Sequence, residues 1–269
     1  MELELKGNVA VITGGASGIG LASAHCFLAE GASVMLWDVS PDTSQIAQQL
    51  SAQYACQVHC LQVDVTRSES VAKAAEMTMD QLGRVDHLVH CAAIGSGKFG
   101  FPFTNMKPDD WPRVLEMNIM GMVHVAHAIA PKMSAAGRGT MVFLASVAGQ
   151  IGSQTDPPYS ASKAANINFS QCLAKDLAPH GVRVNTICPG MVRTPLNRSV
   201  WQAWYDQAPE SERLSYEAWT DRKIKAVVPM GTWQTPDDIA SMVVFLSSKR
   251  AGQVTGQTIN VDGGFVMHW

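Results

Sequence analysis

Short apolar runs alternate with amphipathic helical stretches through most of this sequence, and that alternation limits the possible folds more than any other feature. The runs are apolar along their whole length, a pattern typical of strands buried on both faces. Such strands, separated by helices, predict a parallel sheet covered by helices on both sides. The predicted strands are residues 8–13, 32–37, 58–62, 87–90, 141–144, 182–187 and 258–261. The predicted helices are residues 19–30, 42–53, 68–82, 111–135 and 159–177, with Ser68 as the N-cap of the third.

The length of the chain and its even composition predict a single domain. With 269 residues, the chain can bury a substantial core. The sequence has no internal repeat and no low-complexity linker. We therefore predict one domain over residues 1–269, of the α/β class, built as a doubly wound parallel sheet.

Charge, hydropathy and cysteine spacing exclude several classes of partner. The 20 Lys and Arg residues and 23 Asp and Glu residues give a net charge of −3, with no basic stripe, so we predict no nucleic-acid partner. No apolar run reaches the roughly 20 residues that cross a bilayer. The start of the chain lacks the apolar core of a signal peptide. These features predict no membrane partner and a cytoplasmic location. The six scattered cysteines predict reduced thiols and no metal site.

A glycine-rich turn follows the first predicted strand and reads Thr13-Gly14-Gly15-Ala16-Ser17-Gly18-Ile19-Gly20. A glycine turn that opens a helix allows backbone N–H groups and the helix N-terminus to face a pyrophosphate. The spacing Gly-x-x-x-Gly-x-Gly differs from the common Gly-x-Gly-x-x-Gly fingerprint of dinucleotide sites. Taken alone, the turn is equally compatible with an ordinary strand-to-helix connection.

Asp38 follows the second predicted strand, where a carboxylate can accept hydrogen bonds from the adenosine ribose and repel a 2′-phosphate. No Lys or Arg occupies the glycine turn or directly follows Asp38. These features favour NAD over NADP, although Asp38 is also suited to an ordinary turn before Ser40. Asp64, after the third strand, is placed either to bind the adenine amino group or to cap the next helix.

Tyr159 and Lys163 are four residues apart on a predicted helix, so they share one face. At an effective dielectric constant near 20, an ammonium ion about 4.5 Å from a phenolate stabilises it by roughly 3 to 4 kcal/mol. This energy corresponds to about 2 to 3 pKa units, enough to move a phenol towards the range of general acid–base catalysis. The same spacing also occurs on ordinary exposed helix faces, so the rest of the chain decides its meaning.

Several spaced motifs together resemble the short-chain dehydrogenase/reductase family, in its shorter, NAD(H)-using group. The resemblance covers about residues 6–264 and implies a Rossmann-like fold and NAD(H)-dependent alcohol dehydrogenase or carbonyl reductase activity. The motifs are Thr13-Gly14-x-x-x-Gly18-x-Gly20, Asp64-Val65, Asn118, Ser146, Tyr159-x-x-x-Lys163 and Pro189-Gly190-x-x-x-Thr194.

The resemblance implies four catalytic residues: Asn118, Ser146, Tyr159 and Lys163. Ser146 follows a predicted strand at the sheet edge where α/β proteins bind ligands, and its hydroxyl can hold the substrate oxygen. Tyr159 is expected to exchange a proton with that oxygen as general acid and base. Lys163 is expected to lower the phenol pKa and to hold the nicotinamide ribose. Asn118 is expected to position a water that links Lys163 to solvent.

The resemblance also implies a cofactor site for NAD. Where the family usually has Asn-Ala-Gly after the fourth strand, this chain has Cys91-Ala92-Ala93, and we expect Cys91 to be a buried small residue rather than a reactive thiol. The segment Pro189-Gly190 and beyond resembles the part that holds the nicotinamide carboxamide, although it can also be a simple turn. The predicted cofactor contacts are Gly14, Ser17, Gly18, Ile19, Gly20, Asp38, Asp64, Val65, Cys91, Ala92, Ala93, Tyr159, Lys163, Pro189, Gly190, Val192 and Thr194.

The strand–helix alternation stops after the sixth strand, and by resemblance about residues 191–229 form a substrate lid. Its aromatic residues at helical spacing, Trp201 among them, can form the lid core or contact substrate. Polar residues near the predicted mouth leave room for a polyol, a sugar or another hydroxylated molecule. The predicted substrate contacts are Ser146, Gln150, Ser153, Gln154, Tyr159, Arg193 and Trp201.

The tail from Phe265 to Trp269 is short and ends in large apolar groups. Because an exposed terminal Trp needs a cover, and because members of the family are commonly oligomers, we predict a homotetramer or a dimer in which this tail packs against a neighbouring subunit.

The sequence thus predicts an NAD-binding catalytic domain that interconverts a small secondary alcohol and its ketone. One alternative is a 3-oxoacyl acyl-carrier-protein reductase, disfavoured because such enzymes usually prefer NADPH and because no basic patch adjoins the pocket. A second alternative, a catalytically silent NAD-binding sensor, is disfavoured because all four catalytic positions are filled.

Overall fold

A seven-stranded parallel sheet forms the centre of the molecule in this computed structural model, which describes residues 2–153 and 155–267. The strand order is β3-β2-β1-β4-β5-β6-β7. The chain therefore moves outward from β1 to β3, returns to β4, and continues in the opposite direction. The point of reversal, between β1 and β4, is the place where such sheets bind ligands. The strands are β1 Val9–Thr13, β2 Ser33–Asp38, β3 Val58–Gln62, β4 His87–His90, β5 Gly139–Leu144, β6 Val182–Pro189 and β7 Thr258–Val261.

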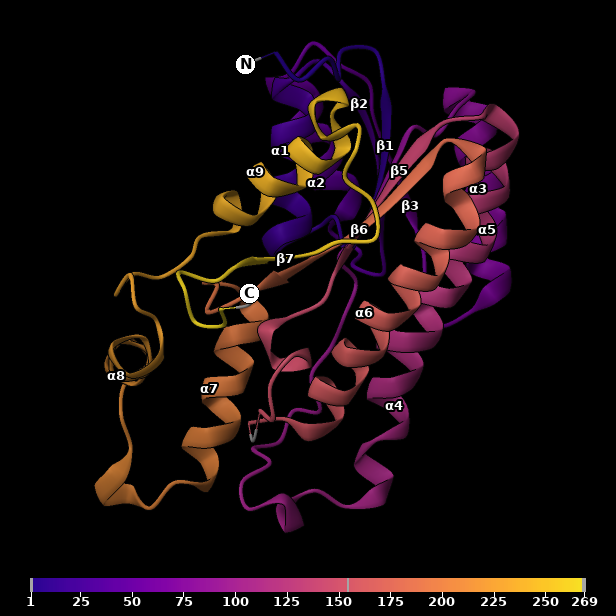
Figure 1. Cartoon of the computed structure of the whole chain (residues 1–269). Helices are drawn as coiled ribbons and strands as arrows, with labels where there is room; N and C mark the ends of the chain where they lie inside the picture. The colour runs from indigo at the N-terminus through magenta and orange to yellow at the C-terminus, as the bar shows by residue number, and fades with distance from the viewer. Residues whose placement is uncertain (1, 154, 268–269) are drawn as a thin grey trace.

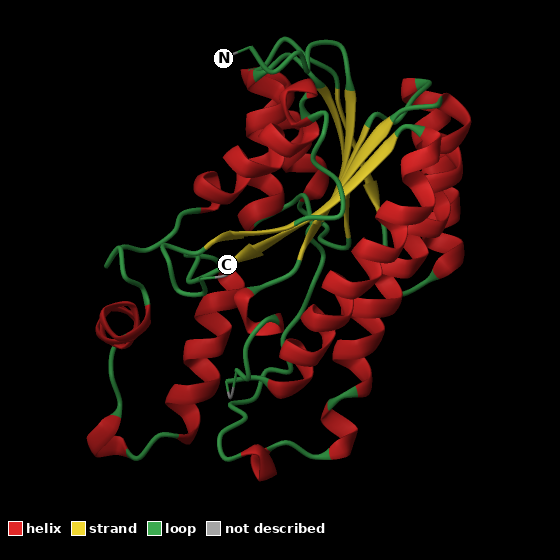
Figure 2. Cartoon of the chain, viewed as in Figure 1, coloured by secondary structure: helices red, strands yellow, loops and turns green. Residues whose placement is uncertain are grey.

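Helices cover both faces of the sheet (Figures 1 and 2). The apolar side chains of α1, α2 and α9 pack on one face, and those of α3, α5 and α6 pack on the other. The predicted single-domain, doubly wound α/β fold is thereby confirmed. The helices are α1 Gly18–Ala29, α2 Thr43–Gln53, α3 Ser68–Leu82, α4 Pro112–Leu115, α5 Gly121–Ala136, α6 Pro157–Leu177, α7 Pro195–Gln207, α8 Tyr216–Val227 and α9 Pro236–Ser247. No helix in the described parts of the chain is long and apolar enough to cross a membrane.

Three details differ from the sequence prediction. The prediction that Ser68 is an N-cap is wrong, because Arg67 is the N-cap of α3. The long helix expected at residues 111–135 contains a π-helical turn, Glu116–Met120, between α4 and α5. Helix α9 has no counterpart among the helices predicted from the sequence. Its start has a capping box, in which Thr235 and Asp238 exchange side-chain and backbone hydrogen bonds, followed by Pro236 at the first helical position.

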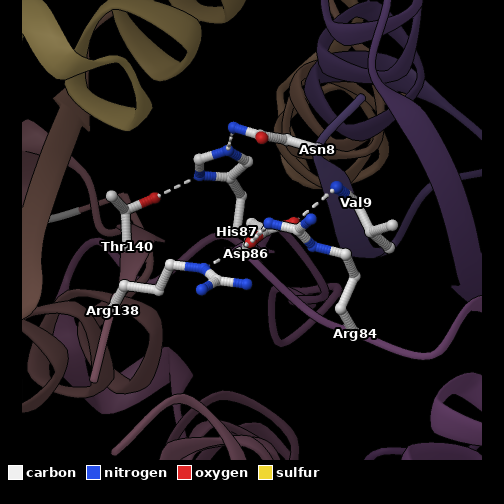
Figure 3. Close-up of polar contacts among 7 residues, drawn as sticks. All are labelled: Asn8, Val9, Arg84, Asp86, His87, Arg138 and Thr140. Carbon is white, nitrogen blue, oxygen red and sulfur yellow. Dashed lines mark hydrogen bonds and ion pairs between the residues drawn. The ribbon is translucent and has the colours of Figure 1, made fainter. Parts of the chain in front are cut away.

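The amino edge of the sheet contains a buried polar cluster around Asp86 and His87 (Figure 3). One oxygen of Asp86 accepts a hydrogen bond from the Val9 N–H at 2.9 Å, and the other pairs with the Arg84 guanidinium. Arg138 also pairs with this carboxylate, at 3.4 Å. These bonds satisfy a carboxylate that would otherwise be costly to bury.

The imidazole of His87 lies between two polar partners at the same edge. Its Nε2 lies 2.9 Å from the Asn8 amide nitrogen, and its Nδ1 lies 2.7 Å from the Thr140 hydroxyl. Because an amide nitrogen can only donate, Nε2 is the acceptor and the ring is neutral. Burial lowers the pKa of His87 to about 4.

Candidate active site

The glycine turn at residues 14–20 packs tightly against neighbouring backbone. Gly14 has a φ of +64°, and a Cβ there would lie 2.9 Å from the Ala92 nitrogen. A Cβ on Gly20 would overlap the carbonyl of Gly14. Ser17, the N-cap residue of α1, is exposed and makes no side-chain cap bond to the described residues. The first turn of α1 thus presents free backbone N–H groups, which suit a phosphate.

Asp38 extends from the end of β2 to the glycine turn. Its Oδ2 accepts a hydrogen bond from the Ala16 N–H at 2.9 Å, and its Oδ1 accepts one from the Ser40 N–H at 3.0 Å. The structure therefore accommodates both interpretations of this residue. One oxygen closes the turn before Ser40, while the other fixes the carboxylate beside the predicted phosphate-binding turn.

The Asp64–Val65 pair lies at the end of β3. Asp64 Oδ1 accepts bonds from the N–H and the hydroxyl of Thr66, at 2.9 and 2.7 Å. The carboxylate closes a turn, while Arg67 is the N-cap of α3, so the alternative of Asp64 as the helix cap is wrong. The Val65 carbonyl lies 2.9 Å from Nδ1 of His124 and joins this segment to α5.

The segment Cys91–Ala93 continues from β4 beside the glycine turn. The Thr13 hydroxyl accepts hydrogen bonds from the N–H groups of Cys91 and Ala92, at 3.2 and 3.3 Å. Burial raises the pKa of the Cys91 thiol to about 12, so the thiol remains protonated. The hydroxyl on β1 thus anchors the segment that departs from the family motif, and the thiol is unsuited to act as a nucleophile.

The segment after β6 lies over the same turn. Pro189 ends the strand, and the Gly190 N–H donates to the Val261 carbonyl at 3.2 Å. Val192 is buried and forms a parallel bridge with Gln234. The Thr194 methyl group lies 3.5 Å from the position that a Cβ on Gly18 would occupy. The segment at residues 189–194 and the glycine turn therefore form two sides of one site.

Asn118 is fully buried in the π-helical turn between α4 and α5. Its Oδ1 accepts the Ile94 N–H, and its Nδ2 donates to the Ile94 carbonyl, both at 2.9 Å. A third bond, also 2.9 Å, joins Nδ2 to the Ser162 hydroxyl. The side chain of Asn118 thus ties the segment after β4 to α6, and its three bonds leave it little capacity to hold a water. The water-positioning role expected of Asn118 stays a prediction.

Ser146 and Tyr159 meet at the carboxyl edge of the sheet. Ser146 follows β5, and its hydroxyl accepts the Ala148 N–H at 3.1 Å and hydrogen-bonds to the Tyr159 phenol. Burial raises the pKa of Tyr159, and the bond from Ser146 opposes this rise. We expected Lys163 to lower the pKa of Tyr159. The pKa is raised instead, because the loss of hydration on burial outweighs the effect of the neighbouring ammonium.

Lys163 lies one turn further along α6, with its Nζ 5.5 Å from the centre of the Tyr159 ring. The side chain is only 2 % exposed, and Nζ donates a 2.7 Å bond to the Leu144 carbonyl. Burial lowers its pKa to about 8. No carboxylate in the described chain pairs with this ammonium. An ammonium has three donors, so two remain for the hydroxyls of a ligand.

These features fit a bound dinucleotide. The uncapped helix start and the close-packed glycines suit its pyrophosphate, and Asp38 lies where a ribose diol would accept a carboxylate partner. The unused donors of buried Lys163 suit a second ribose. By contrast, the described residues contain no group of three His, Cys, Asp or Glu side chains arranged to hold a metal ion.

Two of the polar residues expected to contact substrate, Gln150 and Ser153, form hydrogen bonds with other parts of the protein. Gln150 donates through Nε2 to the Asn260 side chain at 2.8 Å, so half of its amide braces β7. The Ser153 carbonyl lies 3.4 Å from the Ser160 hydroxyl at the start of α6, and Ser153 is half-buried. Gln154 lies outside the described residues.

Trp201 contacts other residues of the predicted lid. Its ring centre lies 5.2 Å from that of Tyr205 and 5.7 Å from that of Tyr216, and its indole nitrogen donates to the Leu214 carbonyl. These contacts join α7 to α8 and favour the lid-core interpretation of Trp201 over the substrate-contact interpretation.

Arg193 lines a hollow of about 700 Å³ where α7 and α8 begin. Its guanidinium lies 5.0 Å from the ring centre of Trp233. Arg198 and Thr194 line the same hollow. Arg193 thus belongs to the predicted carboxamide-binding segment, at the base of the predicted lid.

The described part of the tail folds back onto its own chain. Phe265 and Val266 pack beside a small cluster formed by Ala145, Val147 and Cys188. The chain itself therefore covers part of the apolar surface that the sequence analysis assigned to a neighbouring subunit. The last two residues, 268 and 269, lie outside the described residues, and the subunit contact stays a prediction.

Sequence reasoning did not single out Asp156. This residue is buried, directly precedes α6, and caps its first turn by accepting the Tyr159 N–H at 3.3 Å. The signal was present, because an Asp followed by two prolines is typical of a helix start.

Comparison with known proteins links this geometry to a family. The family model adh_short_C2, described as Enoyl-(Acyl carrier protein) reductase, matches residues 14–266. The match includes the glycine turn, both residues of the Tyr159–Lys163 pair and the segment after β6.

Individual relatives align over almost the whole chain. The 3-oxoacyl-(acyl-carrier-protein) reductase FabG of Thermotoga maritima is 32 % identical over 98 % of this chain and 100 % of its own length. The NAD-dependent glycerol dehydrogenase of Listeria innocua is 30 % identical over 99 % of this chain and 96 % of its own. The solved structure of L-sorbose reductase from Gluconobacter frateurii, in complex with NADPH and L-sorbose, has a TM-score of 0.90 and 30 % identity, with 100 % of both chains covered.

Proposed function

Since the chain belongs to the short-chain dehydrogenase/reductase family, we propose that it is an NAD-dependent oxidoreductase that interconverts a secondary alcohol and its ketone. The observation that carries this proposal is the meeting of Ser146 and Tyr159 at the carboxyl edge of the sheet, next to the buried ammonium of Lys163. A phenol, a hydroxyl and a cation are the groups that proton transfer at an alcohol oxygen requires.

Each side chain of this group has a separate task. Bound nicotinamide supplies the hydride chemistry. The Ser146 hydroxyl holds the substrate oxygen. Tyr159 donates its proton to that oxygen when the ketone is reduced and takes the proton back when the alcohol is oxidised. Lys163 holds the ribose hydroxyls with the donors that Leu144 leaves free.

Asp38 supports the preference for NAD. Its carboxylate is fixed beside the glycine turn through the Ala16 N–H. A 2′-phosphate there would meet a negative charge and no cation from the turn. The L-sorbose reductase structure contains NADPH, so cofactor choice varies among proteins of this fold, and Asp38 is the residue on which our assignment rests.

The substrate is proposed to be a hydroxylated molecule such as a polyol or a sugar. The relatives named for glycerol and L-sorbose support this class. Gln150 and Ser153 lie on the stretch between Ser146 and Tyr159, where a hydroxylated substrate would find polar partners. The segment 191–229 would cover the substrate, and its aromatic core would keep the cover rigid.

A 3-oxoacyl acyl-carrier-protein reductase is the second candidate, because the Thermotoga maritima relative carries that name. The two candidates differ in cofactor and substrate. We therefore expect NADH to bind at least tenfold more tightly than NADPH in a fluorescence titration, and NADH to form at 340 nm from polyols near pH 9. Equal binding of the two cofactors, with turnover of a 3-oxoacyl thioester by NADPH and none of the polyols, would support the second candidate instead.

A further inference from the structure

The carboxylate of Asp156 joins the start of α6, the helix that carries Tyr159 and Lys163, to the loop that follows β4. Its Oδ1 accepts the Tyr159 N–H at 3.3 Å, and its Oδ2 accepts the Ser96 N–H at 2.7 Å. The residue is 6 % exposed. No Lys or Arg of the described chain forms an ion pair with it. Burial raises the pKa of Asp156, and hydrogen bonds from Ser96 and from the Tyr159 N–H oppose that rise.

The same carboxylate lies where the loop after β4, the start of α6 and the start of α7 meet. A Cβ on Gly95 would be 2.9 Å from Asp156 Oδ2 and 3.8 Å from a methyl carbon of Leu196. Gly95 belongs to the loop after β4, Asp156 precedes α6, and Leu196 lies in the first turn of α7. The carboxylate of Asp156 thus lies where the loop after β4, the start of α6 and the first turn of α7 come together.

Besides burial, four groups around the phenol of Tyr159 bear on how easily it ionises. Asp156 and Lys163 flank it along α6, Cys188 faces it from the end of β6, and the Ser146 hydroxyl bonds to it after β5. Burial is the largest cause that raises the pKa of Tyr159; Ser146 lowers this pKa, and Asp156 and Cys188 raise it further. Burial raises the pKa of Cys188 to about 12, so its thiol is neutral at working pH. Asp156 is therefore the ionised group among these four that opposes the phenolate.

We propose that Asp156 is a positioning residue that raises the pH at which Tyr159 takes the proton of the alcohol, and that it couples this proton transfer to the loop at residues 94–100. The proposal rests on the proposed role of Tyr159 as general acid and base. During oxidation the alcohol O–H bond breaks, its proton goes to the phenolate oxygen, and the hydride leaves the carbon for the bound NAD. A fixed negative charge nearby makes the phenolate harder to form, so the phenol stays protonated to higher pH and alcohol oxidation, which needs the phenolate, begins at higher pH.

The test is the pH profile of kcat/KM for alcohol oxidation in the full-length protein. Asp156→Asn removes the charge and keeps one acceptor oxygen, and Asp156→Ser keeps a short N-cap side chain. As the pH rises, kcat/KM should increase with an apparent pKa, and we call this part of the profile the rising limb. We expect this apparent pKa to fall by about one unit in both variants, because the negative charge of Asp156 is gone. Asp176→Asn is the matched control: it removes an exposed carboxylate near the other end of the same helix and should leave the limb unmoved.

The outcomes separate the inference from the function on which it rests. If the variants lose the same fraction of activity at every pH and the apparent pKa of the profile does not change, Asp156 has only a structural role and the inference is overturned. A limb that moves to higher pH would overturn it too. If the Asn variant fails to fold, as seen by circular dichroism, the Ser variant decides. If Tyr159→Phe keeps full activity, the proposed function itself fails, whatever the Asp156 variants do.

Discussion

Tyr159 and Lys163 lie one helical turn apart on α6, and burial acts on the two in opposite directions. It raises the pKa of the phenol and lowers that of the ammonium to about 8. Both shifts favour the neutral forms, because a buried site solvates charge poorly. The spacing in the sequence correctly predicted that the two residues share one face of a helix, but it contained no information on how deeply they are buried. The sequence therefore predicted the partners and overestimated what the lysine alone does to the phenol.

Asp38 provides a test of cofactor choice. Asp38→Ala removes the charge that would repel a 2′-phosphate, so we expect the ratio of NADPH to NADH affinity to rise by at least tenfold. Fluorescence titration with both cofactors measures this ratio. Asp42→Asn, an exposed carboxylate just beyond the same turn, is the control and should leave the ratio unchanged. An unchanged ratio in the Ala variant would remove Asp38 from cofactor selection.

Gly20 belongs to the first turn of α1 and lies against the Gly14 carbonyl. A methyl group there cannot fit without moving the glycine turn, because the obstacle is backbone. Gly20→Ala should weaken NADH binding by more than tenfold, and it should also lower the thermal midpoint. Gly83→Ala is the comparison, since its site has open space but a φ of +72°, so it tests backbone strain alone and should leave NADH affinity unchanged. Normal NADH affinity in Gly20→Ala would contradict the close packing.

Helix α9 offers a measure of how well its capping box works. Thr235 accepts the Asp238 N–H, while Asp238 accepts the Thr235 N–H at 2.7 Å. Thr235→Ala should cost about 1 kcal/mol of unfolding free energy and lower the thermal midpoint by roughly 2 to 4 °C. Ser241→Ala, on the exposed face of the same helix, is the control. Equal midpoints for the two variants would show that the cap contributes nothing.

Helices and strands were predictable where the spacing of apolar residues and the length of the segment both indicated the same type of element. The strands followed from uniform apolar runs, and β3, β4 and β7 begin and end at the predicted residues. The π-helical turn around Asn118 did not follow from the local apolar pattern, and the bonds of Asn118 to Ile94 and Ser162 join it to residues that are distant in sequence. The contacts of Trp201 with Leu214 and Tyr216 likewise depend on where α8 packs. Local sequence specifies the elements, while such long-range contacts decide what each side chain can reach.

The buried cluster at the amino edge predicts how the whole fold responds to acid. His87 has a pKa of about 4 in the folded protein and about 6.5 when unfolded. The unfolded chain therefore binds a proton first, so stability is lost as the pH falls from about 6.5 to about 4. From pH 7 to pH 5 this residue alone should reduce the unfolding free energy by about 2 kcal/mol.

Urea unfolding at pH 7 and pH 5 measures this loss. His87→Gln has no titrating group at this position, so its loss between the two pH values should be smaller than that of the original protein. His124→Gln, a half-buried histidine on α5, is the comparison and should keep most of the original loss. Identical pH dependence in His87→Gln and the original protein would contradict the neutral, buried imidazole.

The most direct test of the proposed hydride-transfer site is the Tyr159→Phe variant, assayed for both turnover and NADH binding. We expect kcat to fall by at least a thousandfold on whichever alcohol the original protein oxidises, because the proton acceptor is lost. NADH affinity should change by less than threefold, since the ring remains and Lys163, the proposed ribose-binding residue, is unchanged. Turnover within tenfold of the original protein would contradict the account.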